Sequence, residues 1–575
     1  MKNALLFPNF LALMMLAMSP LPAEDKPAVE SGPIQKQPWL QPDADAILKW
    51  QQMRFGMFIH WGPVSLTGHE IGWSRGRETT IDEYDNLYKK FDPENFDADR
   101  WVSIAKAAGM KYIVLTTKHH DGFCLWDTKQ TDFNIMNSAM SRDVTKEIAE
   151  ACQRQGIAFG TYHSVCDWHH PDFPRNSPGG KVRREKSDIQ SYRRYLRAQV
   201  KELIENYGPL VTMWFDVPQE FDADEGSENI RICRELQSDI VVNNRAGGGL
   251  GDYATPEQRV GGFDIDQPWE TCMTICRQWA WKPDDKMKSL AECLQTLIRT
   301  AGGDGNLLFN VGPMPNGEIE ARQVDRLQQM GDWLAEYGET IYATRGGPYK
   351  PTKHLVSTRK GNTVYLHILS WPDEVIRVPN LPATLLNHHV ITGGSIVLTT
   401  VDDEIEIRIP QSDRQEIDTI VAIELDQPAI ELAPISVSYV GQSLTEGRQA
   451  TASNVFQRSA QYAAAKAVDA DNSTRWATDA ETKECSLEVD LGKPERFDRA
   501  VLDECVEYGV RVHSFELQYR DGEDWKTFFQ GTTIGRGLSV NFDPVTARHV
   551  RLRIHGDDGP TINEFQLFTP KRTKP

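Results

Sequence analysis

The chain has 575 residues. This is too long for one ordinary hydrophobic core, so we expect roughly two to four domains. Its composition, 40% hydrophobic and 25% charged, is that of a globular protein. A net charge of −19 and a pI near 5.3 argue against nucleic acid and anionic membranes as partners.

The first 23 residues have the features of a secretory signal peptide. Lys2 precedes an apolar run that extends to about Met18, and "SPLPA" then stands before the charged "EDK". This run is too short for a membrane-spanning helix, and the pattern predicts cleavage near Ala23. We therefore expect a periplasmic or secreted protein, with a linker over residues 24–45.

Strand-like and helix-like stretches alternate from residue 46 to residue 345. The strand-like stretches are almost continuously apolar, as strands buried on both faces of a parallel sheet must be. They are 55–62, 111–120, 157–165, 210–217, 240–245 and 306–313. The alternation predicts a (β/α)8-like barrel, with a doubly wound open sheet as the alternative.

Two of the intervening stretches have clear helix signals. "DVTKEIAEACQRQG" (143–156) opens on an aspartate cap and ends in glycine. In residues 188–208 one apolar stripe has helical spacing. Its members are Leu196, Val200, Leu203, Ile204 and Tyr207.

Two antiparallel β-sandwiches are predicted after the barrel. Residues 346–432 contain short alternating runs such as "NTVYLHILSW" and "EIEIRIP", and "QPAIELAPIS" marks the next boundary. Residues 433–575 contain further short runs, including "SFELQYRD" and "HVRLRIHG", and predict a larger sandwich.

Nine cysteines are spread thinly along the chain, which is not the pattern of a disulfide scaffold. Cys485 and Cys505 flank neighbouring strand-like runs and could pair. Cys272 and Cys276 have helical spacing, and we interpret them as packing residues rather than as zinc ligands.

The candidate functional residues lie at the ends of the predicted strands. Each predicted strand runs into a polar or aromatic cluster; the clusters are His60-Trp61, His119-His120-Asp121, Tyr162-His163, Trp214-Asp216 and Asn243-Asn244-Arg245. In a barrel all these carboxyl ends converge on one face, where the active site lies, so the clusters favour the barrel.

The adjacent histidines in "KHHDGF" could bind a metal, pack in the interior or bind a polar substrate. Adjacent residues on a regular strand point to opposite faces, so His119 and His120 could not both ligate one ion there. The chain also has no HExxH or HxH motif. We therefore favour substrate binding.

A carboxylate, Asp216 in "MWFDVP", ends one of the apolar strands. Either it is a buried structural ion-pair partner, or it is a nucleophile or base kept ionised by Arg245 from the next strand. Glycoside hydrolysis would require a second carboxylate. The candidates are Glu257 and Glu270, both in the region that we expect to be rich in loops after residue 245.

Several motifs together resemble the α-L-fucosidases of glycoside hydrolase family 29. They are "RFGMFIHWGP", "KHHDGFCLW", "MWFDVP", "WETC" and "GGDGNLLFNVGPMPNGEI", in order over roughly residues 45–345. The resemblance implies a barrel followed by a β-sandwich, and a retaining exo-α-L-fucosidase that requires no catalytic metal. Its substrates would be fucosylated oligosaccharides, polysaccharides or glycoprotein glycans.

The resemblance also implies roles for individual residues. Asp216 matches the family nucleophile, and Glu257 stands where the acid/base is usually found, with Glu270 as the competing choice. Further positions match the residues that bind fucose; these are His60, Glu70, Trp73, His119, His120, Tyr162, Trp214 and Arg245. An apolar wall of tryptophan and phenylalanine side chains would hold the C6 methyl group of the sugar.

The last part of the chain resembles a discoidin-like (coagulation-factor type C) carbohydrate-binding module, through "AVDADNSTRWAT" and "INEFQLF". Hard oxygen donors suit calcium. A structural calcium ion could be held by Asp469, Asn472, Thr474 and Glu564.

Two other functions stay open from the sequence. One is a metal-dependent barrel hydrolase, which a chelator would inactivate. The other is a catalytically inactive protein that binds fucose, which would not turn over a chromogenic α-L-fucoside.

Overall fold

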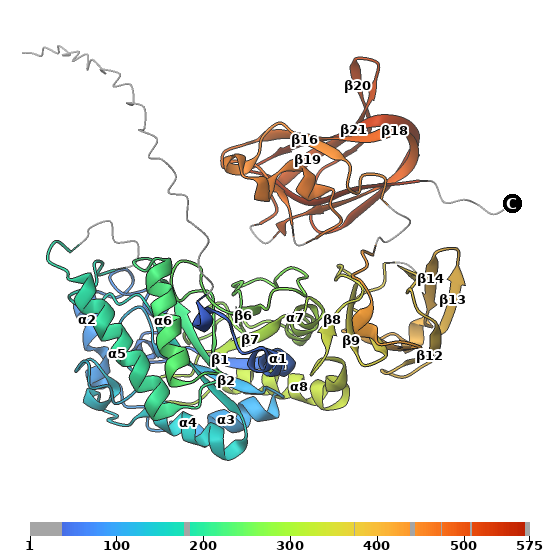
Figure 1. Ribbon diagram of the computed structural model, residues 1–575. Helices are drawn as coiled ribbons and strands as arrows, with labels where there is room; N and C mark the ends of the chain where they lie inside the picture. The colour runs from blue at the N-terminus through green and yellow to red at the C-terminus, as the bar shows by residue number, and fades with distance from the viewer. Residues whose placement is uncertain are drawn as a thin grey trace, which may run out of the picture. The chain divides into compact units, whose positions relative to one another are not determined.

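The computed structural model describes residues 37–177, 184–372, 374–437, 443–472, 474–506 and 509–569. The predicted signal peptide over residues 1–23 lies outside the described residues. Within these ranges no helix is both long enough and apolar enough to cross a membrane. The described chain begins with an α/β part and continues with β-strands and a few short 3-10 helices (Figure 1).

A curled parallel sheet of seven strands is the framework of the α/β part, counted over the described residues. The strands are β1 Phe55–Ile59, β2 Tyr112–Lys118, β3 Ala158–Ser164, β4 Thr212–Asp216, β5 Val241–Val242, β6 Glu270–Thr274 and β7 Asn306–Val311. Their order is β5-β4-β3-β2-β1-β7-β6. Because the last strand lies beside the first, the sheet curls back on itself, unlike a doubly wound open sheet.

The sequence prediction failed around strands β5 and β6. The strand expected over residues 240–245 is reduced to Val241–Val242, and β6 was not predicted at all. Parallel bridges join Asn243 to Tyr253, Ala254 to Trp269 and Glu257 to Cys272. Residues 253–257 therefore lie between β5 and β6 as an irregular strand-like segment, and not as a free loop.

Helices connect most of the strands. They are α1 Ala44–Met53, α2 Ile81–Asn86, α3 Ala98–Ala107, α4 Val144–Gln155, α5 Ile189–Tyr207, α6 Ala223–Leu236, α7 Leu290–Gly302 and α8 Ala321–Tyr337. The predicted cap of α4 is confirmed, since the Asp143 side chain accepts from Lys146 N and Gly156 adopts the left-handed conformation at φ 72°. The predicted apolar stripe of α5 is buried.

The concave side of the curled sheet is filled by large side chains. Tyr112, Tyr162, Trp214 and Tyr253 belong to one buried cluster, which Trp50 of α1 joins. The rings of Trp50 and Tyr253 lie 4.3 Å apart. This packed interior leaves the carboxyl ends of the strands as the place for a site.

The next part of the chain forms two antiparallel sheets, in agreement with the predicted change to all-β structure. The first has the order β12-β15-β10-β9-β8 and the second the order β11-β14-β13. The strands are β8 Arg345–Gly346, β9 Leu355–Lys360, β10 Thr363–Ile368, β11 Ile376–Pro379, β12 Leu385–Val390, β13 Val397–Val401, β14 Glu404–Arg408 and β15 Thr419–Leu425. Both sheets contribute residues to one apolar core.

The C-terminal part is also built from β-strands, but two of them are much longer than predicted. The strands are β16 Gln449–Ala452, β17 Trp476–Ala477, β18 Glu484–Glu504, β19 Val512–Asp521, β20 Asp524–Gly531, β21 Leu538–Gly556 and β22 Thr561–Phe568. The register between β18 and β21 shifts after Asp490 and after Phe497. Such irregularities let long strands bend instead of breaking into the short strands that we expected.

The cysteines are buried. Cys485 is a thiol that forms no disulfide, so the pairing with Cys505 suggested by the sequence is wrong. Cys272 and Cys276 are buried packing residues, as predicted.

Candidate active site

The predicted site residues converge at the carboxyl ends of the parallel strands. His60 directly follows β1, His119 and His120 directly follow β2, and Asp216 is the last residue of β4. The His60 and His119 rings lie 5.6 Å apart, and the His119 ring stacks on Tyr162 at the same separation. The convergence expected from the sequence is therefore present.

Asp216 is buried and held from several sides. Its Oδ1 accepts from Arg245 Nη1 at 2.7 Å and from the Val217 backbone N–H at 2.9 Å. Its Oδ2 accepts from the Tyr162 hydroxyl at 2.7 Å. Burial alone would raise the pKa of Asp216, but the Arg245 charge and the hydrogen bonds from Arg245 and Tyr162 outweigh it and hold the pKa below its usual value. The carboxylate is ionised.

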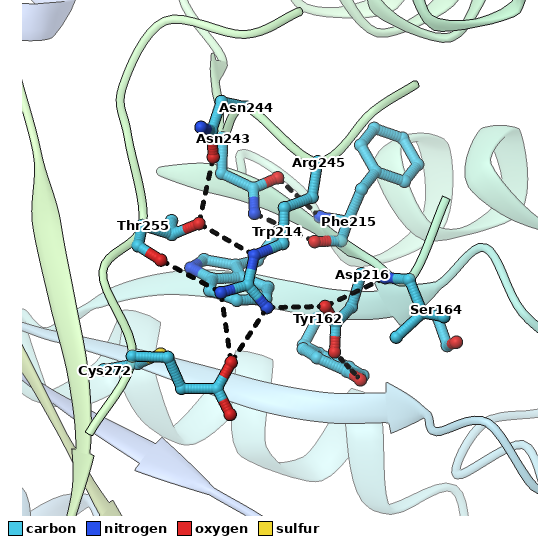
Figure 2. Close-up of polar contacts among 12 residues, drawn as sticks. Tyr162, Ser164, Trp214, Phe215, Asp216, Asn243, Asn244, Arg245, Thr255 and Cys272 are labelled. Atoms are coloured by element: carbon cyan, nitrogen blue, oxygen red, sulfur yellow. Dashed lines mark hydrogen bonds and ion pairs between the residues drawn. The ribbon is translucent and has the colours of Figure 1, made fainter. Parts of the chain in front are cut away.

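Arg245 lies between two carboxylates. Figure 2 shows its guanidinium directed toward Asp216, with Thr255 on the other side. Its Nη1 contacts Asp216 Oδ1 at 2.7 Å and Glu257 Oε2 at 3.2 Å. Because both oxygens contact one nitrogen, they lie at most about 6 Å apart. Paired carboxyl groups stand about 5–5.5 Å apart in retaining glycosidases and about 6.5–9.5 Å apart in inverting ones.

Glu257 lies on the strand-like segment over residues 253–257, which corrects our expectation of a loop. The Cys272 backbone N–H donates to Pro256 O at 3.1 Å, and Gln258 N donates to Cys272 O at 2.9 Å. The side chain of Glu257 is 44% exposed, whereas that of Asp216 is 13% exposed. The segment fixes the backbone of Glu257 while its carboxylate stays open to solvent.

Glu270 is placed differently from our expectation. It is the first residue of β6 and is fully buried, at the opposite end of that strand from the site. Its carboxylate accepts from the Tyr112 hydroxyl, and from Trp214 Nε1 at 3.0 Å. Burial raises the pKa of Glu270 to about 7. Both carboxylate oxygens accept hydrogen bonds in the interior, and Glu270 thereby holds the Trp214 ring in place.

The adjacent histidines do not diverge, which corrects the strand argument. Strand β2 ends at Lys118, and the turn that follows brings the His119 and His120 ring centroids to 4.0 Å. His120 Nε2 lies 3.8 Å from Asp216 Oδ2. Both histidines therefore belong to the same pocket as Asp216.

The pocket histidines are neutral. Burial lowers the pKa of His60 to about 3 and that of His120 to about 4, and it lowers the pKa of His119 well below its usual value. His60 Nδ1 contacts Asn310 Oδ1 at 2.6 Å, and His120 Nδ1 contacts Ser164 Oγ at 2.7 Å.

Glu70 and Trp73 lie on one turn at the edge of the pocket. Glu70 accepts from three backbone N–H groups, those of Ile71, Trp279 and Ala280, at 2.9–3.1 Å. Burial raises the pKa of Glu70 although these hydrogen bonds oppose the shift. The Trp73 side chain is partly exposed and meets the His120 ring edge-on at 5.4 Å.

Sequence reasoning missed Trp279 and Asn310. The Trp279 ring lies 4.8 Å from the His60 ring and 6.0 Å from that of Phe58. Trp279 comes from an irregular stretch with no periodic signal. Asn310 interrupts the apolar strand "NLLFNVGP", and a polar residue in a buried strand is a signal that could have identified it.

No cluster of three or more His, Cys, Asp or Glu side chains suited to a metal occurs among the residues that the structure describes. At the predicted calcium site, Thr474 Oγ1 lies 2.9 Å from both Asp469 carboxylate oxygens. Glu564 is buried, and its Oε1 has no hydrogen-bond partner among the residues that the structure describes. Burial and the nearby Asp469 charge raise its pKa well above the usual value.

Two family models match the chain. A model described as "Alpha-L-fucosidase" matches residues 24–339, and one described as "F5/8 type C domain" matches residues 449–565. The plasma alpha-L-fucosidase of Homo sapiens is 31% identical to this chain over 372 residues, which are 58% of this chain and 78% of that protein.

Solved structures of bacterial fucosidases are similar to the same region. Alpha-L-fucosidase isoenzyme 1 from Paenibacillus thiaminolyticus is 31% identical and superposes with a TM-score of 0.62, covering 66% of this chain and 99% of that one. A trapped covalent intermediate of an α-L-fucosidase from Bacteroides thetaiotaomicron is 25% identical, with a TM-score of 0.61 over 67% of this chain and 97% of that one.

Proposed function

This chain belongs to the α-L-fucosidase family, and from that premise we propose that it removes terminal α-L-fucose from glycans by retaining double displacement. It is a glycoside hydrolase with a C-terminal F5/8 type C domain, and fucosylated glycans are its substrates. The observation that carries the mechanism is the single Arg245 nitrogen shared by Asp216 and Glu257, because it keeps the two contacting oxygens at most about 6 Å apart. This is below the spacing of about 6.5–9.5 Å that inverting glycosidases have.

Asp216 is the proposed nucleophile. Its place at the end of β4 and its ionised state suit an atom that must attack along one line. We assign the attack to Oδ2, which accepts from Tyr162 and faces His120, whereas Oδ1 is held by Arg245 and Val217. A covalent intermediate has been trapped in the Bacteroides relative, which supports a reaction through a covalent intermediate in this chain.

Glu257 is the proposed acid/base, and Glu270 is proposed to be structural. Glu257 is exposed at the mouth of the pocket, where a leaving group would stand. Burial gives Glu270 a pKa of about 7, which would suit an acid, but its two oxygens are bound to Tyr112 and Trp214 in the interior. An acid must first be within reach of the glycosidic oxygen.

The pocket has a polar side that suits the hydroxyl groups of fucose and an apolar side that suits its C6 methyl group. Neutral histidines, Tyr162 and the Glu70 turn offer hydrogen bonds to hydroxyl groups. Trp214, Phe58 and Trp279 form the apolar side, with the Phe58 and Trp214 rings 5.5 Å apart. We propose that this aromatic side holds the C6 methyl group.

Azide rescue tests the two carboxylates. In Asp216→Gly, azide should attack the substrate directly and give the β-fucosyl azide. In Glu257→Ala, azide should attack the fucosyl-enzyme and give the α-azide. The assignment of Glu257 is wrong if Glu270→Ala gives the α-azide while Glu257→Ala stays near the wild-type rate.

The two alternatives are tested with the same substrate. Turnover of an aryl α-L-fucoside by the intact chain excludes an inactive fucose-binding protein. Activity that survives prolonged chelation, with metal content measured on the same sample, excludes a catalytic metal.

We also propose an eight-stranded barrel followed by two β-sandwiches. We infer that residues 253–257 take the place of the eighth strand, since they bridge to Asn243 on one side and to β6 on the other. The two sheets of residues 345–425 share one core, which supports a small sandwich, and residues 433–575 would form the second.

A structural calcium ion is proposed for the C-terminal module, at Asp469, Asn472, Thr474 and Glu564. The support is the buried Glu564 oxygen, which has no hydrogen-bond partner within the described ranges and lies near the charge of Asp469. Calcium should raise the melting temperature of the wild type and not that of Glu564→Gln. An equal rise in the melting temperatures of both proteins would contradict the proposed calcium site.

Export is proposed from the first 23 residues. N-terminal sequencing of the mature protein should begin after Ala23, in the periplasm or the medium. A cytoplasmic chain that retains Met1 would contradict this.

A further inference from the structure

Two of the pocket histidines are held through the same ring atom by a polar side chain from another strand. Asn310 on β7 holds His60 through Nδ1, at 2.6 Å, and Ser164 at the end of β3 holds His120 through Nδ1, at 2.7 Å. All four side chains are buried. Which nitrogen of each ring carries the hydrogen depends on what these partners can donate or accept.

Ser164 has one hydroxyl hydrogen, and the direction of that hydrogen determines which ring nitrogen of His120 is protonated. Ser164 Oγ lies 2.8 Å from the Cys166 carbonyl oxygen, which can only accept a hydrogen bond. The serine hydrogen is therefore directed to Cys166, and Ser164 Oγ is left as an acceptor toward the ring. His120 Nδ1 must carry the hydrogen.

The amide of Asn310 is oriented in the same way. Asn310 Nδ2 donates to the Trp279 carbonyl at 2.8 Å, so Oδ1 is the atom that faces His60. An amide oxygen accepts and does not donate, and His60 Nδ1 therefore carries the hydrogen. Trp279 is itself fixed, because its backbone N–H donates to Glu70 at 2.9 Å.

Each ring then has one hydrogen, on Nδ1, because burial keeps both imidazoles neutral. The Nε2 atoms carry no hydrogen, so each can only accept a hydrogen bond. His120 Nε2 faces Asp216 Oδ2 across 3.8 Å, and neither atom can donate to the other. A sugar hydroxyl placed beside this pair could donate its one hydrogen to His120 Nε2.

We propose that Asn310 and Ser164 are positioning residues that fix His60 and His120 as hydrogen-bond acceptors, so that the substrate must supply two donating hydroxyl groups. This inference rests on the proposed function, since it places a sugar in the pocket. It defines the substrate class further. A fucose unit that is methylated, sulfated or acylated at either of these hydroxyl groups is not a substrate.

The pH profile of Asn310→Asp tests the His60 half. A carboxylate still accepts from Nδ1–H, so substantial activity should remain at neutral pH. Its negative charge stabilises the imidazolium form, which has no acceptor for the sugar. The acidic limb of kcat/KM should therefore move up by at least one pH unit. Asn310→Leu should lose about 30-fold or more in kcat/KM without that shift.

The control is Asn137→Asp, which adds the same charge at the exposed last residue of a short 3-10 helix, Ile135–Asn137, and should leave the profile unchanged. A wild-type acidic limb in Asn310→Asp would overturn the proposal for His60, because a side chain that merely fills space would not move it. Melting temperatures of all variants identify any that fail to fold.

Ser164 is tested by two substitutions and by substrate analogues. Ser164→Ala should lower kcat/KM at least tenfold, and Ser164→Thr, which keeps the hydroxyl, should restore most of it. Fluorine accepts weakly but cannot donate. At the two positions that face the histidines, a deoxyfluoro-L-fucose should therefore inhibit no better than the matching deoxy sugar.

Wild-type kinetics in Ser164→Ala, or fluoro sugars that bind like fucose at every position, would overturn the proposal. Absence of fucosidase activity in the wild-type chain would instead overturn the proposed function, so the two failures are distinguishable.

Discussion

Thr255 shows how one hydroxyl can control a charged residue at the site. Its Oγ1 accepts from Arg245 Nε at 2.9 Å and donates to Asn244 Oδ1 at 3.0 Å (Figure 2). Thr255→Val keeps the shape but leaves the Nε–H of the half-buried Arg245 guanidinium without this partner. We expect kcat/KM to fall about tenfold, equivalent to about 1.4 kcal/mol. Steady-state kinetics on an aryl fucoside measure this.

The same substitution at the exposed Thr399 on β13 is the matched control and should change nothing. If Thr255→Val is as active as the wild type, Arg245 is held well enough by Asp216 and Glu257, and the role given to Thr255 is wrong.

Glu270 should make stability depend on pH. Burial raises the pKa of Glu270 from 4.5 to about 7 in the folded protein. The folded state then binds a proton more tightly than the unfolded chain, so stability falls as pH rises from 4.5 to about 7 and is level above that. The effect is at most about 3.5 kcal/mol, at about 1.4 kcal/mol for each pH unit.

Glu270→Gln should remove this slope. The melting temperature of Glu270→Gln minus that of the wild type should rise between pH 4.5 and 7. A hydrogen bond lost in the variant would lower its melting temperature by the same amount at every pH and would not change this trend. Thermal unfolding at four pH values measures it, with Glu185→Gln at an exposed position as the control. Parallel curves for Glu270→Gln and wild type would contradict the assignment.

At the scale of elements, helices α3 and α8 pack through a glycine. A methyl group at Gly331 of α8 would overlap the Ala107 carbonyl oxygen and lie 3.0 Å from Ala108 Cα. Gly331→Ala must therefore separate the helices, although alanine is the better helix former. We expect a loss of about 1–3 kcal/mol of stability, with kcat unchanged because the site is at the strand ends.

Denaturant unfolding measures the loss, and Asp325→Ala on the exposed side of α8 is the control. A more stable Gly331→Ala protein would mean that helix propensity outweighs the packing contact.

Residues 253–257 are an element that the sequence did not reveal. Pro256 and the short runs around it give no strand periodicity. The segment forms backbone hydrogen bonds with Asn244 on one side and with Pro268, Glu270 and Cys272 on the other. Its pairing is decided by where β5 and β6 lie in space. Glu257 therefore owes its fixed backbone position to contacts that are distant along the chain.

At the scale of the whole molecule, the proposed catalytic residues lie before residue 345. Asp216, Glu257 and the pocket histidines all belong to the curled sheet and its connections. A chain that ends near residue 435 should therefore hydrolyse a small aryl fucoside within tenfold of the wild-type kcat/KM. Kinetics and circular dichroism together test this prediction.

A tenfold or larger loss with an unchanged circular dichroism spectrum would contradict it, because the C-terminal module would then act on the site itself. A polymeric fucosylated substrate assayed in parallel shows whether the module contributes to binding larger glycans.

The sequence by itself determined the family, the strand-helix alternation and most of the residues at the strand ends. These follow from local patterns, since apolar runs, caps and ionisable residues after a strand can be read without knowing what lies beside them. Asp216, Arg245 and the histidines were found in this way, and the structure brings them together.

Tertiary structure alone decided the burial of Glu270, the pairing of residues 253–257, and the Asn310 and Ser164 contacts to the histidines. The His60 and Asn310 side chains are 250 residues apart in the chain, and those of Glu270 and Tyr112 are 158 apart. The physical reason is that parallel strands pair only after long crossover connections. Hydrogen-bond partners across the curled sheet, and with them tautomers and buried charge, are therefore set by the fold.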